Sequence, residues 1–223
     1  MSQLAPLSPT ERTILGRKKI RAVTDRSALY ALLNEALICH LGVVRDGSPL
    51  VVPTGFGRDG DTLYLHGSTG ASSLRLAGAG VEVCVTVTLL DGIVYARSIN
   101  NHSMNYRSAV VLGKAKPVDE PEAKMHALRV ITDHLAPGSW EHARDVNAKE
   151  FAAVSVLALD LAEASLKIRA AGPGDDPDDL AANASWAGVL PIRTVFGEPE
   201  PCTTLADDFP TPPHVTSRAA ATR

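Results

Sequence analysis

The chain has 223 residues, of which 45% are hydrophobic and 21% are charged, as in an ordinary soluble globular protein. No apolar run reaches the roughly 20 residues of a membrane-spanning helix, and the N-terminus lacks the order of a secretory signal. The net charge of −3 and the lack of a dense Lys/Arg stripe argue against a nucleic-acid partner. We therefore expect a cytoplasmic protein that binds neither membranes nor nucleic acid.

The chain shows no internal break in composition, and its three cysteines are far apart. Cys39 and Cys84 lie in apolar stretches and Cys202 lies in the tail, which fits neither a disulfide framework nor a metal site. We predict that the chain divides into an N-terminal extension (1–19), one domain (20–197) and a Pro/Thr-rich C-terminal tail (198–223). The tail is expected to be mobile or to lie on a partner.

The first half of the domain predicts a helix followed by a run of strands. Asp25 has the position of an N-cap, and apolar residues follow it at helical spacing up to Leu37. Two β-rich runs around a glycine-containing turn predict a hairpin over residues 38–55, and residues 62–66 predict a third strand.

Further strands are predicted beyond residue 80. The valines of residues 81–89 alternate with polar residues, so one face of this strand is apolar. Asp91 and Gly92 predict a turn into a strand over residues 93–98, and residues 108–118 predict another long strand.

Asp119 and Glu122 have the spacing of a capping box, and they predict a helix that ends before Pro137. Further β-like runs follow at residues 151–161, 164–170 and 189–196. Because the strands do not alternate with helices, the order of elements favours an antiparallel barrel with flanking helices over a βαβ fold.

A candidate phosphate-binding segment lies within residues 63–76, LYLHGSTGASSLRL, where a strand gives way through a turn to a short helix. Free N–H groups, serine hydroxyls and a guanidinium are all groups that bind phosphate oxygens. The candidate residues are Gly67, Ser68, Ser72, Ser73 and Arg75. The alternative is an ordinary connection whose serines cap the helix and whose arginine is solvated.

Two other groups of polar residues are candidates for a site. His66 ends the third strand, either at the rim of a pocket or as a hydrogen-bonded surface residue. The polar stretch NNHSMNYRS holds Asn105, Tyr106 and Arg107, and we predict a loop there that reaches across an interface to a ligand's ring. The alternative for this stretch is a solvated connection between strands.

Four stretches resemble a known family: LYLHGS (63–68), VTVTLLDGIVYARS (85–98), HSMNYRSAVVLGKA (102–115) and WAGVLPIRTVFGEPEP (186–201). They are similar to the flavin-nucleotide-binding branch of the pyridoxamine 5′-phosphate oxidase-like family, and to its nitroimidazole-reductase-like members. The resemblance implies a mainly β fold with flanking helices, a six-stranded antiparallel split β-barrel of the FMN-binding type. It also implies a homodimer whose flavin sites lie at the subunit interface.

The resemblance further implies where FMN would bind. The isoalloxazine ring would lie beside the backbone of Val52, Pro53 and Thr54, with Asn105, Tyr106 and Arg107 close by and Trp186 covering the ring. The ribityl and phosphate groups would lie near His66, Gly67, Ser68, Ser72, Ser73 and Arg75.

The sequence also departs from its relatives. Where they commonly read Pro-Gly-Arg-Trp, this chain has Ser139, and where more basic relatives often carry Arg it has Ser72 and Ser73. The Arg-x-His element that holds the substrate phosphate in true pyridoxamine phosphate oxidases is not recognisable. We therefore do not expect vitamin B6 oxidation.

The leading hypothesis is an oxidoreductase whose bound flavin passes electrons to a small oxidant such as a nitroaromatic, a quinone or oxygen. His66 is the candidate catalytic residue, because nitroimidazole-reducing relatives have a histidine close to the flavin. The alternative is a non-catalytic sensor, carrier or store, since split barrels also bind haem and deazaflavin. His66 or His102 could then ligate haem iron, although neither lies in a CxxCH motif. A third hypothesis is a barrel that has lost its cofactor.

Overall fold

The computed structural model describes residues 6–7, 10–205 and 209–220. The strands are β1 (Ala22–Val23), β2 (Ile38–Arg45), β3 (Ser48–Asp59), β4 (Thr62–Ser68), β5 (Glu82–Tyr95), β6 (Ser103–Lys114), β7 (Lys116–Pro117), β8 (Val154–Asp160), β9 (Ala164–Arg169) and β10 (Gly188–Pro191). The α-helices are α1 (Arg26–Glu35), α2 (Ser72–Gly78), α3 (Pro121–Leu135), α4 (Ala148–Ala153), α5 (Pro177–Ala182) and α6 (Pro213–Ala220). Two short 3-10 helices are η1 (Lys19–Arg21) and η2 (Ile99–Asn101).

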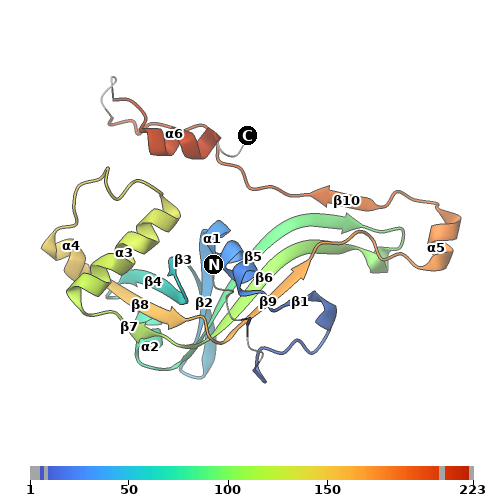
Figure 1. Cartoon of the computed structure of the whole chain (residues 1–223), viewed down its shortest axis with the longest axis horizontal. Helices are drawn as coiled ribbons and strands as arrows, with labels where there is room; N and C mark the ends of the chain where they lie inside the picture. Colours follow the sequence, from blue (N-terminus) through green and yellow to red (C-terminus); the bar gives the residue numbers. More distant parts are fainter. Residues whose placement is uncertain (1–5, 8–9, 206–208, 221–223) are drawn as a thin grey trace.

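The strands form one antiparallel sheet with the order β1-β9-β6-β5-β2-β3-β4-β8-β7, and β10 pairs with β5 (Figure 1). The path does not close on itself, so the sheet is a split barrel, with helices outside it. The predicted mainly β class with flanking helices is therefore confirmed. No helix in the described ranges is long and apolar enough to span a membrane.

Helix α1 begins as the sequence predicts, because the Asp25 carboxylate accepts a hydrogen bond of 2.9 Å from the Ser27 amide. Its Leu29, Leu32 and Leu33 side chains are buried in the main core. The alternating valines of β5 enter the same core, and the predicted hairpin is formed by β2 and β3. The apolar periodicity of these segments was thus sufficient to locate them.

The predicted turn at Asp91 and Gly92 is wrong, because β5 continues through both residues to Tyr95. The register between β5 and β6 shifts between Leu90 and Gly92, so the irregularity is a β-bulge. A Cβ on Gly92 would lie 3.0 Å from the Leu190 carbonyl oxygen of β10. The glycine therefore serves the close approach of β10 to the bulge and does not reverse the chain.

The loop predicted over residues 100–107 is also wrong. It is η2 followed by the start of β6, which pairs with β5 from Ser103 onwards. Polar side chains can occupy such a strand because the β5–β6 hairpin extends beyond the barrel as an arm, which Figure 1 shows on the right. We call the part of the hairpin from Leu89 to Arg107 the arm.

Helix α3 begins one residue later than the capping box predicts. Glu120, not Asp119, is the N-cap, and its carboxylate accepts from the amides of Glu122 (3.0 Å) and Ala123 (2.7 Å). Pro121 explains the shift, because proline is favoured at the first helical position and has no N–H to be capped. The helix ends at Leu135, before Pro137 as predicted.

Helix α3 covers β3, β4 and β8 on the face opposite the main core (Figure 1). Its Ala127 and Ile131 are buried there together with Val156 of β8. Gly57 of β3 makes the contact possible, because an added Cβ would lie 2.8 Å from the Ile131 Cα. This second, smaller apolar layer is the one next to His66.

The termini and cysteines complete the fold. Within the predicted tail, α6 lies against the end of α3, where Arg218 donates a hydrogen bond to the Leu135 carbonyl oxygen and His214 contacts His142. Residues 206–208 and 221–223 of that tail lie outside the described residues. Of the cysteines, Cys39 is buried, Cys84 is half-buried and Cys202 is exposed.

Candidate cofactor site

The candidate site begins where β3 and β4 separate. These strands pair only from Phe56 to Asp59, and beyond that point residues 48–55 of β3 pair with β2 while residues 66–68 of β4 pair with β8. The other edge of β3 has no partner among the described strands from residue 48 to residue 55. We call this opening the split. Its free backbone groups can bind an external ring edge.

Val52, Pro53 and Thr54 lie on the open edge of β3. Pro53 lacks an N–H, which suits a position on an unpaired edge. The Thr54 hydroxyl donates to the neighbouring Gly55 carbonyl oxygen at 3.2 Å. The predicted ring-binding residues are therefore accessible from the split.

His66 lies at the other side of the split, on the β4 face that α3 covers. Its Nδ1 atom is buried and has no hydrogen-bond partner among the described residues. Burial lowers the pKa of His66, because the charged imidazolium is poorly solvated there. The ring is thus neutral near pH 7 and keeps a nitrogen that can bind a ligand atom.

Helix α2 follows the end of β4. Its N-cap is Ala71, which offers no side-chain cap, and the hydroxyls of Ser72 and Ser73 have no hydrogen-bond partner in the described part of the chain. The Ser68 hydroxyl accepts from the Gly70 amide at 3.1 Å. The alternative in which the serines cap the helix is therefore not what the structure contains.

Two further residues shape this segment. Arg75 is exposed on α2, and no described carboxylate lies within ion-pair distance of it. Gly67 lets α2 pack closely on β4, since an added Cβ would lie 2.6 Å from Leu74 Cδ1. His66 and α2 thus both lie at the end of β4 that borders the split, His66 on the face that α3 covers and α2 on the side of the main core.

Asn105, Tyr106 and Arg107 lie on the arm, and β5 and β2 separate them from β3 in the sheet order. Arg107 forms ion pairs with Glu35 of α1 and with Asp91, the latter at 2.8 Å. Hydrogen bonding to these carboxylates raises the pKa of Arg107 and, for Glu35, lowers the pKa of the carboxyl. The Arg107 guanidinium is therefore already paired with two carboxylates of the same chain.

The other arm residues also have partners. The Asn105 Oδ1 accepts from Arg169 Nη1 at 2.5 Å and from the Ala171 amide at 3.1 Å. The Tyr106 hydroxyl accepts from Arg21 Nη1 at 3.4 Å. In a single chain the structure does not join these three residues to the split through any hydrogen bond between described residues.

Trp186 and His102 lie near the tip of the arm. The centroids of the Trp186 and Tyr95 rings lie 5.8 Å apart, and Trp186 remains 69% exposed. The His102 Nδ1 accepts a hydrogen bond of 3.0 Å from the Ala96 amide. A neutral His102 must therefore carry its proton on Nε2, which leaves neither nitrogen free for a metal ion.

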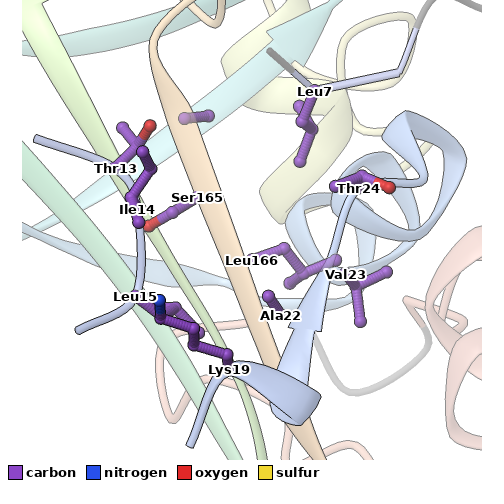
Figure 2. Close-up of a pocket in the computed structure, with 11 residues that line it drawn as sticks. Leu7, Thr13, Ile14, Leu15, Lys19, Ala22, Val23, Thr24, Ser165 and Leu166 are labelled. Carbon is purple, nitrogen blue, oxygen red and sulfur yellow. The ribbon is translucent and has the colours of Figure 1, made fainter. Parts of the chain in front are cut away.

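Several cavities lie elsewhere on the chain. One of about 260 Å³ lies between residues 13–24 and β9, and its walls are mainly apolar (Figure 2). Another of about 400 Å³ contains Arg107 with its two carboxylate partners and the segment after β10. A third of about 620 Å³ lies beside Trp140, between α3 and α4.

Sequence reasoning missed three basic residues that gather beside Tyr106. They are Arg21 of η1 and Lys167 and Arg169 of β9. Two cations at alternate positions of a predicted strand, in SLKIRA, were a signal that could have found Lys167 and Arg169. Arg21 gave no such signal, because only the pairing of β1 with β9 brings it there.

Comparison with known proteins gives one family and several solved structures. The family model described as pyridoxamine 5′-phosphate oxidase matches residues 25–168. A flavocytochrome of Azotobacter vinelandii is 39% identical with a TM-score of 0.90, over 96% of this chain and 99% of that one. An FAD- and haem-binding protein of Mycobacterium smegmatis is 39% identical with a TM-score of 0.86, over 89% and 97%.

A structure from Bacteroides thetaiotaomicron, named for 5-nitroimidazole antibiotic resistance, is also similar. It is 25% identical with a TM-score of 0.57, over 66% of this chain and 86% of that one. Among curated proteins, none matches the sequence.

Proposed function

We propose, since the chain belongs to the pyridoxamine 5′-phosphate oxidase-like family, that it is a redox protein that binds a flavin nucleotide in the split and haem as a second cofactor. The observation that carries the proposal is the buried, unpartnered Nδ1 of His66. A buried polar atom without a partner is costly unless something binds it. The open edge of β3 and the hydroxyls of Ser72 and Ser73 fit a second kind of cofactor, one with both a ring and a phosphate.

The α2 side chains and the β3 backbone would bind different parts of the flavin nucleotide. The Ser72 and Ser73 hydroxyls and the Arg75 guanidinium hold the phosphate, since α2 is only seven residues long and its dipole contributes little. The backbone of residues 52–54 binds the polar edge of the flavin ring. When bound, the flavin supplies hydride or single-electron transfer. The chain orients the ring and limits its contact with water.

Haem is the second part of the proposal, and His66 is the histidine that suits its iron. The pKa of His66 is lowered by burial, which keeps the ring in the neutral form that ligates metals. His102 is less suitable, because its Nδ1 is already bonded to the Ala96 amide. The names of the two relatives that are 39% identical, a flavocytochrome and an FAD- and haem-binding protein, support this second cofactor.

The proposal also covers which flavin nucleotide binds and which reaction it serves. The sequence resemblance favours FMN with deazaflavin as an alternative, whereas one relative is named for FAD. We infer an oxidoreductase that passes electrons from the flavin to a small oxidant. A non-catalytic flavin or haem carrier is the alternative, and turnover of a nitroaromatic or a quinone with a chemical reductant separates the two.

We also propose that the protein is a homodimer. The arm, β10 and the segments on either side of β10 carry exposed apolar side chains in one chain: Leu90, Met104, Trp186, Leu190 and Val195. Several large apolar side chains exposed on neighbouring segments favour an interaction site there. A second copy would cover it and bring the arm of one chain towards the split of the other. Light scattering coupled to size-exclusion chromatography should give twice the mass of 23.5 kDa.

Substitution of Arg75 tests the flavin site. Arg75→Ala should weaken the binding of FMN or FAD by about 1.5–3 kcal/mol, the contribution of a hydrogen bond to a charged group. Flavin fluorescence titration measures the change. Arg45→Ala, on the exposed β2–β3 turn, is the control and should leave affinity unchanged. Equal affinities of the Arg75→Ala protein and the control would place the phosphate elsewhere.

A further inference from the structure

Three positive side chains lie around Tyr106 at the base of the arm. Arg21 Nη1 lies 3.4 Å from the Tyr106 oxygen, and Lys167 is close enough that it also lowers the pKa of the Tyr106 hydroxyl. Arg169 neighbours Tyr106 directly across the β6–β9 pair. We call Arg21, Lys167, Arg169 and Tyr106 the basic cluster.

The strand register explains why these residues meet. Tyr106 pairs with Arg169 and Ser108 pairs with Lys167, so all four side chains lie on the same face of the sheet. Ala109 and Leu166 point to the opposite face and enter the core. Arg21 reaches the cluster because the next residue, Ala22, pairs with Lys167 in β1. The cluster is thus fixed by three paired elements rather than by a loop.

The basic cluster has no acidic partner within the described part of the chain, whereas other arginines do. Arg12, Arg97 and Arg107 each form an ion pair with at least one carboxylate. For Arg21, Lys167 and Arg169, no described Asp or Glu lies within ion-pair distance. Arg169 bonds instead to the carbonyl oxygens of Ala171 and Gly172 at 3.0 Å. Three cations therefore share one half-buried region in which no described residue supplies a counter-charge.

The ionisation of the cluster reflects this imbalance. Burial alone would raise the pKa of Tyr106, but hydrogen bonds from Arg21 and Lys167 and their charges lower it overall. Burial and the charge of Arg21 lower the pKa of Arg169. Like charges held together in this way destabilise each other, and a bound anion would relieve the repulsion.

We propose that the basic cluster is a binding site for an oxyanion, and that a phosphate or pyrophosphate group is the ligand that suits it best. Arginines and a lysine around a hydroxyl are donors that phosphate oxygens accept. The Ser108 hydroxyl, 3.0 Å from that of Thr88, extends the row of donors along the same face. The site is distinct from the phosphate site proposed at α2, because it lies on β6 and β9.

The oxyanion could come from two sources, a phosphate group of the flavin cofactor or a free phosphorylated ligand. The cofactor source rests on the proposed function, whereas the free source does not. Inorganic pyrophosphate is the probe for the site itself. FAD and riboflavin are the probes for the source, because riboflavin has the same ring but no phosphate.

Calorimetric titration of the full chain with pyrophosphate tests the site. We expect Lys167→Gln and Arg21→Gln each to weaken binding about tenfold, as the loss of one charge-assisted contact does. Lys114→Gln, at the exposed other end of β6, is the matched control and should bind like the wild type. If a tightly held cofactor fills the site, pyrophosphate does not bind, and FAD retention should then fall in the Lys167→Gln protein.

The source follows from the flavin titrations. If Lys167→Gln weakens FAD and not riboflavin, the cofactor supplies the oxyanion; if FAD is unaffected and pyrophosphate is weakened, a free ligand does. If the wild type binds no flavin, the proposed function fails while the pyrophosphate result still decides the cluster. The inference is overturned if Lys167→Gln changes neither pyrophosphate nor FAD binding relative to Lys114→Gln.

Tyr106 provides an independent spectroscopic readout. Absorbance at the tyrosinate band should show one of the four tyrosines ionising below the ordinary pKa of about 10. Pyrophosphate should move this phase to higher pH, because a bound anion disfavours the phenolate. Tyr106→Phe should remove the phase. A phase that persists in Tyr106→Phe, or that pyrophosphate leaves in place, would contradict the assignment.

Discussion

The split and the arm differ in whether their polar side chains already have partners within the chain. Next to the split, the backbones of β3 and α3 approach closely at Gly57, and the Nδ1 of His66 has no partner among the described residues. On the arm, Asn105 and Arg107 already have partners from the same chain. The split is therefore organised for a ligand in a single chain, whereas the arm is organised first as a rigid strand pair.

Because of this difference, substitutions in the two regions should have different effects on stability and on ligand binding. Around the split, stability depends on the absence of side chains at glycines, so added atoms should be costly. On the arm, stability depends on partly exposed ion pairs, so the loss of one charged side chain should lower the free energy of unfolding by less. Ligand binding should follow the reverse order, with the polar residues of the split contributing most.

The largest effect on stability is expected at Gly57. Gly57→Ala places a Cβ 2.8 Å from both the Ile131 Cα and the Val130 carbonyl oxygen, which are backbone atoms that cannot turn away. We expect α3 to be displaced from β3 at a cost of about 2–3 kcal/mol in the free energy of unfolding. Urea denaturation measures this cost.

Gly55→Ala is the matched control for this prediction. Gly55 lies on the same face of the same strand, two residues away, and nothing lies within 4 Å of an added Cβ. Alanine there should be neutral or slightly stabilising, because it restricts the unfolded chain. Similar losses in Gly55→Ala and Gly57→Ala would show that close backbone packing does not distinguish this region.

A smaller effect is expected at Arg107. Arg107→Met removes the ion pairs to Glu35 and Asp91, and the two carboxylates are left close together. We expect a loss of about 1–2 kcal/mol, since the partly exposed pairs are weakened by solvent. Arg144→Met, which breaks the exposed pair with Glu150, should cost less. If both variants lose equally, burial of the Arg107 pairs contributes nothing to the arm.

The sequence predicted the elements whose apolar residues repeat regularly. The helix after Asp25, the hairpin over residues 38–55 and the long strand containing Val83 and Val85 follow directly from such patterns. The mainly β class followed from the order of these elements and from resemblance. Local chemistry also located α2 and its free serines.

The remaining features depend on contacts that no local pattern records. Gly92 looks like a turn residue, but its bulge is set by β10, which lies far along the chain. The polar residues around Asn105 resemble a loop because the arm leaves the barrel and has little core to contact. Arg21 joins the basic cluster only through pairing between β1 and β9.

The smallest expected effect is a dependence of stability on pH from His66. Its folded pKa lies below the unfolded value of about 6.5, so below that pH the unfolded state binds more protons. The free energy of unfolding should therefore fall as the pH falls through about 6.5 towards the folded pKa. His134, whose pKa burial also lowers, contributes in the same direction.

Denaturation between pH 5 and pH 8 measures this dependence. His66→Gln should reduce the slope of the free energy of unfolding against pH below about pH 6.5. The variant lacks one histidine whose pKa is lower in the folded state than in the unfolded state. His40→Gln, at an exposed position of β2, is the control for removing a histidine side chain away from α3. An unchanged slope in His66→Gln would mean that His66 is not held in its neutral form.

The absorbance spectrum of the purified protein tests the central claim most directly. A flavin nucleotide gives two bands in the near-ultraviolet and blue, and haem gives a Soret band. We predict both signatures, with His66→Ala shifting or abolishing the Soret band. A colourless protein that binds neither added FMN, FAD nor haem would contradict the account.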